Sequence, residues 1–353
     1  MKRSISSVWT YFILIILFFA IIIWMSFSGI SIKTGLDDDK DRFSVAMVTD
    51  TGGINDRSFN TSSWEGMKEF ASRTGSKARY VESVQSSDYY TNIDKLGDEN
   101  VDLIFGIGFG LADTILKSSG INPELNYAIV DFSYGDDTPD NVSGLVFRAE
   151  ESSFMVGYIA GMTTKTNAVG FVGGIAGQVI SQFEYGYRAG VDYAAKKRGV
   201  NIDTKVQYAE SFSDSAKGKA IALKMFSDGC DIVFHAAGGV GVGVIEGAKE
   251  TNNFAIGVDM DQSYLAPKNV LTSAIKNVGK AVDIVSTDLL NGKNIGGKTF
   301  SYGLKEGCVG LPDENPNLDK KIYEEAIKIQ EEIISGKIFV PYDLETFKEY
   351  QKR

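Results

Sequence analysis

The stretch FSVAMVTDTGGINDRSFN, residues 43–60, joins a short apolar strand to a polar loop and the start of a helix. In open parallel sheets, ligands bind beyond the carboxyl ends of the strands, where loops lead into helices whose first turn has free N–H groups. The apolar run over 43–49 therefore predicts the first strand of an α/β fold, followed by a binding loop. The candidate binding residues in this loop are Asp50, Thr51, Asp56, Phe59 and Asn60.

Beyond this stretch, short apolar runs rich in Val, Ile and Phe alternate with segments of helical period. This alternation is typical of parallel sheets covered by helices. Strands are predicted at residues 43–49, 77–83, 101–108, 126–131, 143–147, 167–174, 205–211, 231–238, 254–259 and 270–275. Helices are predicted at residues 59–74, 111–118, 151–163, 181–198, 215–227, 242–250, 279–290 and 319–337.

The alternation restarts at residue 167 as if from its beginning, after a new helix begins within FRAEESSFMVGYIAGM, residues 147–162. A length of 353 residues also favours two domains. We therefore expect two similar α/β lobes in tandem, with the loops at their strand ends facing one cleft. Further candidates at strand ends are Asp131, His235, Gly238, Asp259 and Lys276.

The N-terminus contains YFILIILFFAIIIWM, an uncharged apolar run over residues 11–25 that two basic residues precede. The uncharged stretch continues to residue 30, which makes it about 20 residues long and sufficient to span a bilayer. Ser-Phe-Ser at 26–28 also matches a small-x-small cleavage site. We predict that residues 1–33 form an uncleaved anchor rather than a cleaved signal. Either alternative places the remaining chain outside the cytoplasm, on the periplasmic side of the inner membrane or at the cell surface.

Beyond residue 33 the chain carries 33 basic against 46 acidic residues, a net charge of −13. Such a surface argues against nucleic acid or another polyanion as partner, because phosphates are bound by an excess of Lys and Arg. The glycine run GGVGVG at 238–243 follows a late strand, so it matches a dinucleotide fingerprint only weakly. A tight turn or a close backbone approach to a neutral ligand explains this run better.

Catalytic and metal sites find little support in the sequence. Cys230 and Cys308 are the only cysteines, and they are expected to be buried free thiols unless they form one bridge. His235 is the only histidine, and no GxSxG elbow accompanies it. We therefore predict no catalytic residue, no metal site and no cofactor.

The paired carboxylates Asp50 with Asp56 and Asp259 with Asp261 leave three interpretations open. They could act as the two carboxylates of a glycosidase. They could serve as turn and helix-capping residues, which applies above all to Asp56 and to Asn60. They could also accept hydrogen bonds from vicinal sugar hydroxyls, which would suit a ligand with a ribose.

Aromatic residues favour the last of these interpretations. Phe59, Phe109, Phe183 and Tyr185 lie at or near the predicted loops, and two facing aromatic rings can hold a flat base. Any one of them alone is more commonly a core residue. Together with the strand-end carboxylates and Lys276, they favour a neutral, planar, hydroxylated ligand.

Several motifs, in order along the chain, resemble the basic membrane protein family. The family groups spirochaetal surface antigens with the purine nucleoside receptor lipoproteins of ABC importers, and the likeness runs from about residue 43 to residue 341. The resemblance implies a type I periplasmic-binding-protein fold of two α/β lobes joined by three crossings. The motifs are DTGGINDRSFN (50–60), LIFGIGFGLAD (103–113), FRAEESSFMVGYIAGM (147–162), VGFVGG (169–174), FEYGYRAGVDYA (183–194), HAAGGVGVGVIEGAKE (235–250) and GVDMDQSYLAP (257–267).

The resemblance also implies roles for individual residues. Phe59 would stack on a purine, with Asp50 and Asn60 in the same loop. Asp259 and Lys276 would hold the ribose hydroxyls. Asp131 would lie near the base. The second stacking face would come from the other lobe, from Phe183 or from the pair Phe234 and His235.

By the same resemblance, the chain is a substrate-binding protein that captures purine nucleosides in an interlobe cleft and delivers them to an ABC permease. We expect a monomer, with lobe I formed by 43–147 and 276–304 and lobe II by 148–275 and 305–345. The alternative is a surface antigen or adhesin that keeps the fold without transport, and a nucleoside hydrolase ranks below both. Two departures from the family are the missing lipoprotein cysteine and His235 at the second stacking position, where many relatives have an aromatic residue.

Overall fold

The computed structural model describes residues 15–16 and 42–352. Residues 43–353 form one compact unit, which is distinct from residues 1–42. The predicted anchor, residues 1–33, lies outside the described residues apart from the two at 15–16. Within the described part of the chain, no helix has both the length and the apolar character required to cross a bilayer.

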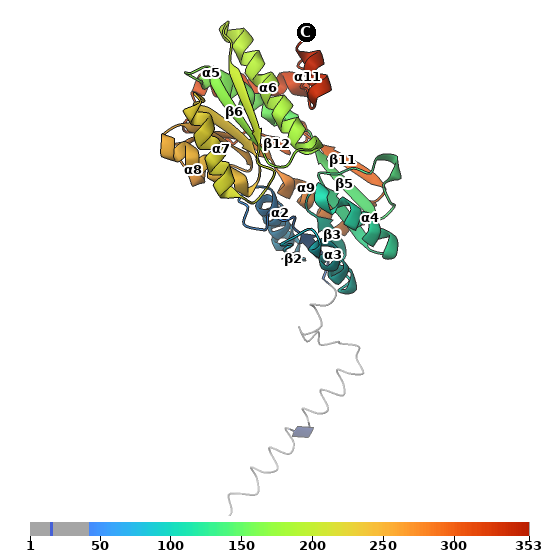
Figure 1. The fold of residues 1–353 in the computed structure, drawn as a ribbon. Helices are drawn as coiled ribbons and strands as arrows, with labels where there is room; N and C mark the ends of the chain where they lie inside the picture. Colours follow the sequence, from blue (N-terminus) through green and yellow to red (C-terminus); the bar gives the residue numbers. More distant parts are fainter. Residues whose placement is uncertain (1–14, 17–41, 353) are drawn as a thin grey trace, which may run out of the picture. The chain divides into compact units, whose positions relative to one another are not determined.

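The first sheet has six parallel strands in the order β11-β5-β4-β3-β1-β2 (Figure 1). Its central strands are buried on both faces, which explains why they are continuous apolar runs rather than alternating ones. The strands are β1 (Ser44–Val48), β2 (Lys77–Val81), β3 (Leu103–Gly106), β4 (Asn126–Val130), β5 (Val142–Phe147) and β11 (Lys298–Tyr302).

The second sheet has the same number of strands, in the order β12-β10-β9-β8-β6-β7. All neighbours are parallel except β12, which pairs antiparallel with β10. The strands are β6 (Ala168–Gly173), β7 (Asp203–Tyr208), β8 (Ile232–Ala236), β9 (Phe254–Asp259), β10 (Val270–Lys276) and β12 (Val309–Gly310). The two sheets with their helices confirm the predicted α/β, two-lobe type I periplasmic-binding-protein fold.

Helices connect the strands and cover the sheets. Helix α2 begins directly after the loop at 50–58 and ends at a left-handed glycine, Gly75, which has no Cβ to oppose that conformation. The helices are α2 (Phe59–Thr74), α3 (Asp88–Asp98), α4 (Ala112–Ile121), α5 (Ala149–Thr163), α6 (Gln178–Arg198), α7 (Ser215–Ser227), α8 (Gly239–Thr251), α9 (Val278–Leu290), α10 (Lys320–Ile334) and α11 (Leu344–Tyr350).

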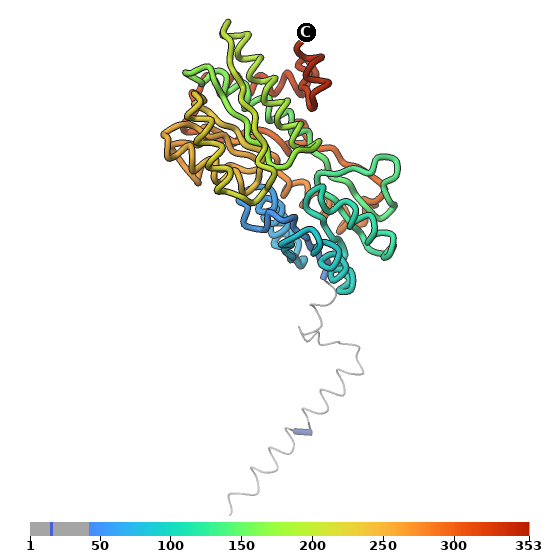
Figure 2. The backbone as a smooth tube through the Cα atoms, in the orientation of Figure 1, coloured from blue at the N-terminus to red at the C-terminus, as the bar shows by residue number. Residues whose placement is uncertain are grey.

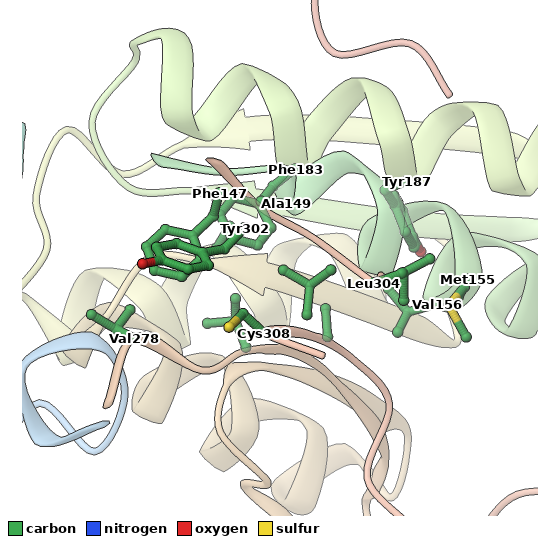
Figure 3. Close-up of a cluster of buried hydrophobic side chains, with 14 of the residues drawn as sticks. Phe147, Ala149, Met155, Val156, Phe183, Tyr187, Val278, Tyr302, Leu304 and Cys308 are labelled. Carbon is green, nitrogen blue, oxygen red and sulfur yellow. The ribbon is translucent and has the colours of Figure 1, made fainter. Parts of the chain in front are cut away.

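The chain crosses between the two sheets three times, after β5, after β10 and after β11 (Figure 2). A single hydrophobic cluster runs through both sheets and through these crossings. Figure 3 shows the part of the cluster at the crossings, which includes Phe147, Tyr302, Leu304 and Cys308 together with Phe183 of α6. The crossings are therefore packed into the core rather than exposed as linkers.

Four elements were not predicted from the sequence. Helices α3 and α11 are short and largely polar, and no helix was predicted over the residues that form them. Strand β11 has the sequence KTFSY and lies at an edge with its side chains mostly exposed, and β12 has only two residues. The two strands lack the long apolar run that marks a buried strand. Helix α3 does carry apolar residues at helical spacing, Tyr89, Ile93 and Leu96, a signal that the prediction did not include.

Helices α5 and α6 pack unusually closely because glycines lie between them. A Cβ on Gly190 would come within 2.7 Å of the backbone nitrogen of Tyr158 and nearer still to the carbonyl oxygen of Phe154. A Cβ on Gly157 would overlap the carbonyl oxygen of Tyr187 in the same way. Since both obstacles are backbone atoms, no side-chain rotation can make room.

We therefore predict that Gly190→Ala forces α5 and α6 apart and destabilises the protein by about 1–3 kcal/mol, as overpacking of a filled interface does. Gly120→Ala in α4 is the matched control, because a Cβ there meets nothing within 4 Å. It should be neutral or stabilising by up to about 1 kcal/mol through helix propensity. Urea unfolding measures both, and equal stabilities of the two variants would contradict the close helix packing.

Candidate functional site

The carboxyl ends of the two sheets enclose a cavity of about 810 Å³, a volume that includes space open to solvent at its mouth. This size suits a ligand of drug or cofactor dimensions. Ten of the predicted binding residues line the cavity: Asp50, Thr51, Asp56, Phe59, Asn60, Asp131, Phe183, Gly238, Asp259 and Lys276. His235 is not among the lining residues.

The loop after β1 places Asp50 and Asn60 side by side. Asp50 Oδ1 accepts hydrogen bonds from Asn60 Nδ2 at 2.8 Å and from the backbone N–H of Gly52 at 2.9 Å. Because Asn60 donates from its amide nitrogen, its oxygen Oδ1 is an acceptor, and among the described residues this buried atom has no partner. A buried acceptor without a partner costs free energy, so this position favours a ligand that donates a hydrogen bond.

Asp56 organises the start of α2. Its carboxylate accepts hydrogen bonds from the backbone N–H groups of Ser58 at 3.0 Å, Asn60 at 2.8 Å and Thr61 at 3.0 Å. These bonds satisfy N–H groups that a helix start leaves without intrahelical partners. The capping interpretation that the sequence left open thus describes the contacts of Asp56, although the residue also borders the cavity.

Lys276 and Asp131 form a buried ion pair that joins the two sheets, since Lys276 ends β10 and Asp131 follows β4. The Lys276 side chain is 2% exposed. Its ammonium lies 4.5 Å from the centre of the Phe59 ring and 5.9 Å from that of Phe183. The negative faces of aromatic rings stabilise a cation at such distances. Lys276 is the only basic residue among the described residues that line the cavity.

Asp259 occupies in the second sheet the place that Asp131 has in the first. Both follow or end a central strand, and both have a left-handed backbone, with φ of 66° for Asp259 and 64° for Asp131. Non-glycine residues adopt this conformation at a cost, and they do so preferentially at functional sites. Ser58 of the first loop donates a hydrogen bond to Asp259 Oδ2, so this carboxylate also contacts the opposite sheet's loop.

Three carboxylates of the cavity, those of Asp50, Asp56 and Asp259, bind protons more tightly than free ones do. Burial raises the pKa of Asp50 from 3.8 to about 6, although the hydrogen bonds from Asn60 and Gly52 oppose the change. Burial likewise raises the pKa of Asp259 to about 6, against the attraction of Lys276 and the hydrogen bond from Ser58. Burial also raises the pKa of Asp56. The cavity therefore disfavours additional negative charge.

Aromatic rings form much of the cavity wall. Phe59, Phe109 and Phe183 line it as predicted for aromatics near the loops, and Tyr89 and Phe212 do so without having been predicted. Tyr89 lies on the unpredicted helix α3. Phe212 follows β7, and its position after a strand end is the sequence signal that marks it as a candidate. Phe109 and Phe212 come from different sheets and meet edge to face, with ring centres 6.4 Å apart.

Two aromatic predictions need correction. Tyr185 does not line the cavity, because its ring lies on α6 against Phe347 of α11, 5.6 Å between centres. Phe234 is fully buried in the core of the second sheet and contacts Phe171 and Tyr187. Neither ring can supply a face of the cavity in this arrangement.

The structure also places His235 away from the cavity. Its side chain is fully buried, and its Nε2 lies 3.0 Å from Gln262 Oε1. Burial lowers the pKa of His235 to about 4, so the ring is neutral at physiological pH. A Cβ on Gly241 would overlap this ring. Packing against His235 therefore explains why residue 241 of the GGVGVG run is a glycine, and nucleotide binding is not needed to explain it.

The cysteines match the sequence prediction of buried free thiols. Burial raises the pKa of both Cys230 and Cys308 to about 11, which keeps them protonated and unreactive. Taken together, the cavity offers aromatic surface, hydrogen-bonding carboxylates, one acceptor amide and one paired ammonium. This set can hold a flat, polar, uncharged molecule.

Comparison with known proteins identifies the family. A family model described as ABC transporter substrate-binding protein PnrA-like matches residues 43–343. Basic membrane protein A1 of Borrelia garinii subsp. bavariensis is 38% identical over 344 residues, which cover 96% of this chain and 99% of that protein. The CD4+ T-cell-stimulating antigen of Listeria innocua serovar 6a is 41% identical over 330 residues, covering 88% of this chain and 91% of that one.

A solved structure agrees with these matches. The ABC transporter system solute-binding protein from Aeropyrum pernix K1 superposes with a TM-score of 0.79 at 26% identity, over 87% of this chain and 96% of that one. The family comprises extracytoplasmic substrate-binding proteins, which bind a small molecule for a transporter, and not enzymes. The resemblance inferred from the sequence motifs is confirmed: the chain belongs to the PnrA-like, basic membrane protein family of ABC transporter substrate-binding proteins.

Proposed function

We propose that this substrate-binding protein captures purine nucleosides between its two sheets and presents them to an ABC permease. The observation that carries the proposal is the composition of the cavity, in which aromatic rings and buried carboxylates lie around a single lysine. A purine is flat and suits stacking on Phe59, whereas a ribose offers hydroxyl donors to Asp259. The second ring of the stack would be Phe183 or Phe212, which both line the cavity from the second sheet's side.

The charge of the cavity supports a nucleoside over a nucleotide. Four carboxylates line it, from Asp50, Asp56, Asp131 and Asp259, and the one ammonium is already paired with Asp131. A phosphate would bring negative charge to a place where burial has already raised the pKa of the carboxyl groups. The unpartnered Asn60 Oδ1 supplies the acceptor that an amino or hydroxyl group of a neutral ligand needs.

We propose further that the two lobes have the boundaries predicted from the sequence, 43–147 with 276–304 and 148–275 with 305–345, except that Lys276 ends β10 and so belongs to the second lobe. The lobes would move as rigid bodies about the three crossings. The protein would act as a monomer and would be held outside the cytoplasm by residues 1–33. The second candidate is a surface antigen without transport. It is favoured by the relative from Listeria innocua that is named an antigen.

A screen against nucleosides separates transport binding from the antigen alternative. The polypeptide 34–353 is suitable because residues 43–353 form a compact unit by themselves. We expect adenosine, guanosine or inosine to raise its melting temperature, since a ligand at 100 times its Kd stabilises the folded state by about 2.7 kcal/mol. The matching nucleoside monophosphates serve as controls and should give no shift. Absence of a shift with every nucleoside would reject the proposed function.

Phe59→Ala should weaken nucleoside binding by about 10- to 100-fold, because one aromatic stacking surface for a base contributes about 1–3 kcal/mol. Trp64→Ala is the matched control on the same helix, since Trp64 packs against Tyr80 and does not line the cavity. It should lower the melting temperature and leave affinity unchanged. Calorimetric titration measures both affinities, and an unchanged affinity of Phe59→Ala would remove Phe59 from the site.

Binding and stability should depend on pH in opposite directions between about pH 5 and 7. Asp259 must be ionised to accept hydrogen bonds from a ribose, so affinity should fall about tenfold per pH unit below its pKa of about 6. Asp50 and Asp259 have folded-state pKa values raised above 3.8. The stability that they contribute to the ligand-free protein is therefore greatest near pH 4 and is lost as the pH rises through 6.

Calorimetric titration and ligand-free melting temperatures over this range measure the two effects. Because acid unfolding would lower affinity and stability together, it cannot imitate the opposite trends. An affinity that does not change from pH 5 to pH 8 would contradict the assignment of Asp259 to the ribose.

A further inference from the structure

Gln262 joins the two sheets at a place outside the cavity. It follows β9, it is fully buried, and it does not line the cavity. Its Nε2 donates a hydrogen bond of 2.9 Å to the carbonyl oxygen of Arg57, in the loop between β1 and α2. Its Oε1 accepts a hydrogen bond of 2.9 Å from the backbone N–H of Val258 in β9. One side chain thus connects the second sheet to the loop of the first.

The orientation of this amide is fixed by its partners. The backbone N–H of Val258 requires an oxygen, which places Oε1 toward β9 and the amino group toward Arg57. The neutral His235 ring donates a second hydrogen bond to Oε1 from Nε2. The ring lies directly against the backbone of Gly241, where a Cβ would overlap it. His235 therefore stabilises the orientation in which Gln262 Oε1 faces β9 and its amino group faces Arg57.

The acceptor on the first sheet is held equally firmly. Arg57 has a left-handed backbone with φ of 55°, and its N–H donates to Thr61 Oγ1 at 2.9 Å. The carboxylate of Asp56 binds the N–H groups on the following residues, as described above. The next residue, Ser58, donates to Asp259 across the same gap. The turn at 56–58 is therefore a rigid projection that presents one acceptor and one donor to the second sheet.

We infer that Gln262 is a positioning residue that latches the two lobes in their closed arrangement around the ligand; this inference rests on the proposed function. The latch acts on the fraction of molecules that are closed, and apparent affinity is proportional to that fraction. Gln262 does not contact the ligand space. Its loss should therefore speed ligand dissociation, which requires opening, and leave the association step, which begins from the open form, nearly unchanged.

The test replaces Gln262 by Met, which has a similar length and no hydrogen-bonding amide. Stopped-flow measurements on the polypeptide 34–353 use whichever of adenosine, guanosine and inosine the wild type binds most tightly. We expect dissociation at least about tenfold faster, with the association rate nearly unchanged. Ser273→Ala is the matched control, since Ser273 Oγ accepts from the backbone N–H of Gln262 at 3.2 Å within the second sheet. It should lower the melting temperature without changing dissociation.

Gln262→Glu is a second variant in case the Met variant does not fold. Its carboxyl can still face Val258 and His235, and it can donate to the Arg57 carbonyl only while protonated. Dissociation from this variant should therefore become faster relative to wild type as the pH rises, a dependence that general loosening would not produce. Dissociation rates equal to wild type in both Gln262 variants, or an equal acceleration in Ser273→Ala, would overturn the latch.

Failure of the proposed function is recognised separately. If the wild type binds none of the three nucleosides, the proposed function is rejected. Small-angle X-ray scattering of the ligand-free proteins then tests whether Gln262 holds the two lobes in their closed arrangement. A larger radius of gyration for Gln262→Met than for wild type and Ser273→Ala supports it. Equal radii overturn it.

Discussion

The buried ion pair between Lys276 and Asp131 determines how the rest of the cavity is built. Removing an ammonium group from water costs several kcal/mol unless a counter-charge and further polar contacts compensate for it. Asp131 supplies the counter-charge, and the faces of Phe59, Phe147 and Phe183 lie within 4.5 to 5.9 Å of the ammonium. Because the pair comes from β10 of one sheet and the end of β4 of the other, satisfying the charge also requires the two sheets to face each other.

The same pair determines which ligands the cavity can accept. With its one lysine neutralised by Asp131, the cavity has no cation left for a phosphate among the residues that the structure describes there. Asp50 and Asp259 remain as acceptors whose pKa values are raised by burial. Such acceptors suit hydroxyl donors and repel anions. The placement of this single charge thus supports the proposed preference for an uncharged ligand.

The sequence was sufficient for the parts of the fold that depend on hydrophobic periodicity and on strand ends. Asp50, Asp131 and Asp259 could be placed at a common edge because parallel strands bring their carboxyl ends together. What the sequence did not provide was the direction of individual side chains at the last residue of a strand. Phe234 and His235 lie near the end of β8, yet one packs in the core and the other against Gln262, and neither lines the cavity.

Unpredicted residues have a related cause. Tyr89 reaches the cavity from α3, a mainly polar helix whose buried residues are Tyr89, Ile93 and Leu96, and Phe212 reaches it from the loop after β7. The turn at 56–60 shows what such local detail contributes. Asp56 fixes the turn through backbone N–H groups, after which Arg57 and Ser58 contact the second sheet and Phe59 and Asn60 line the cavity. Because the contacts between the sheets and two cavity-lining residues come from one turn, a ligand that stacks on Phe59 as we propose would also hold that turn in place for the contacts between the sheets.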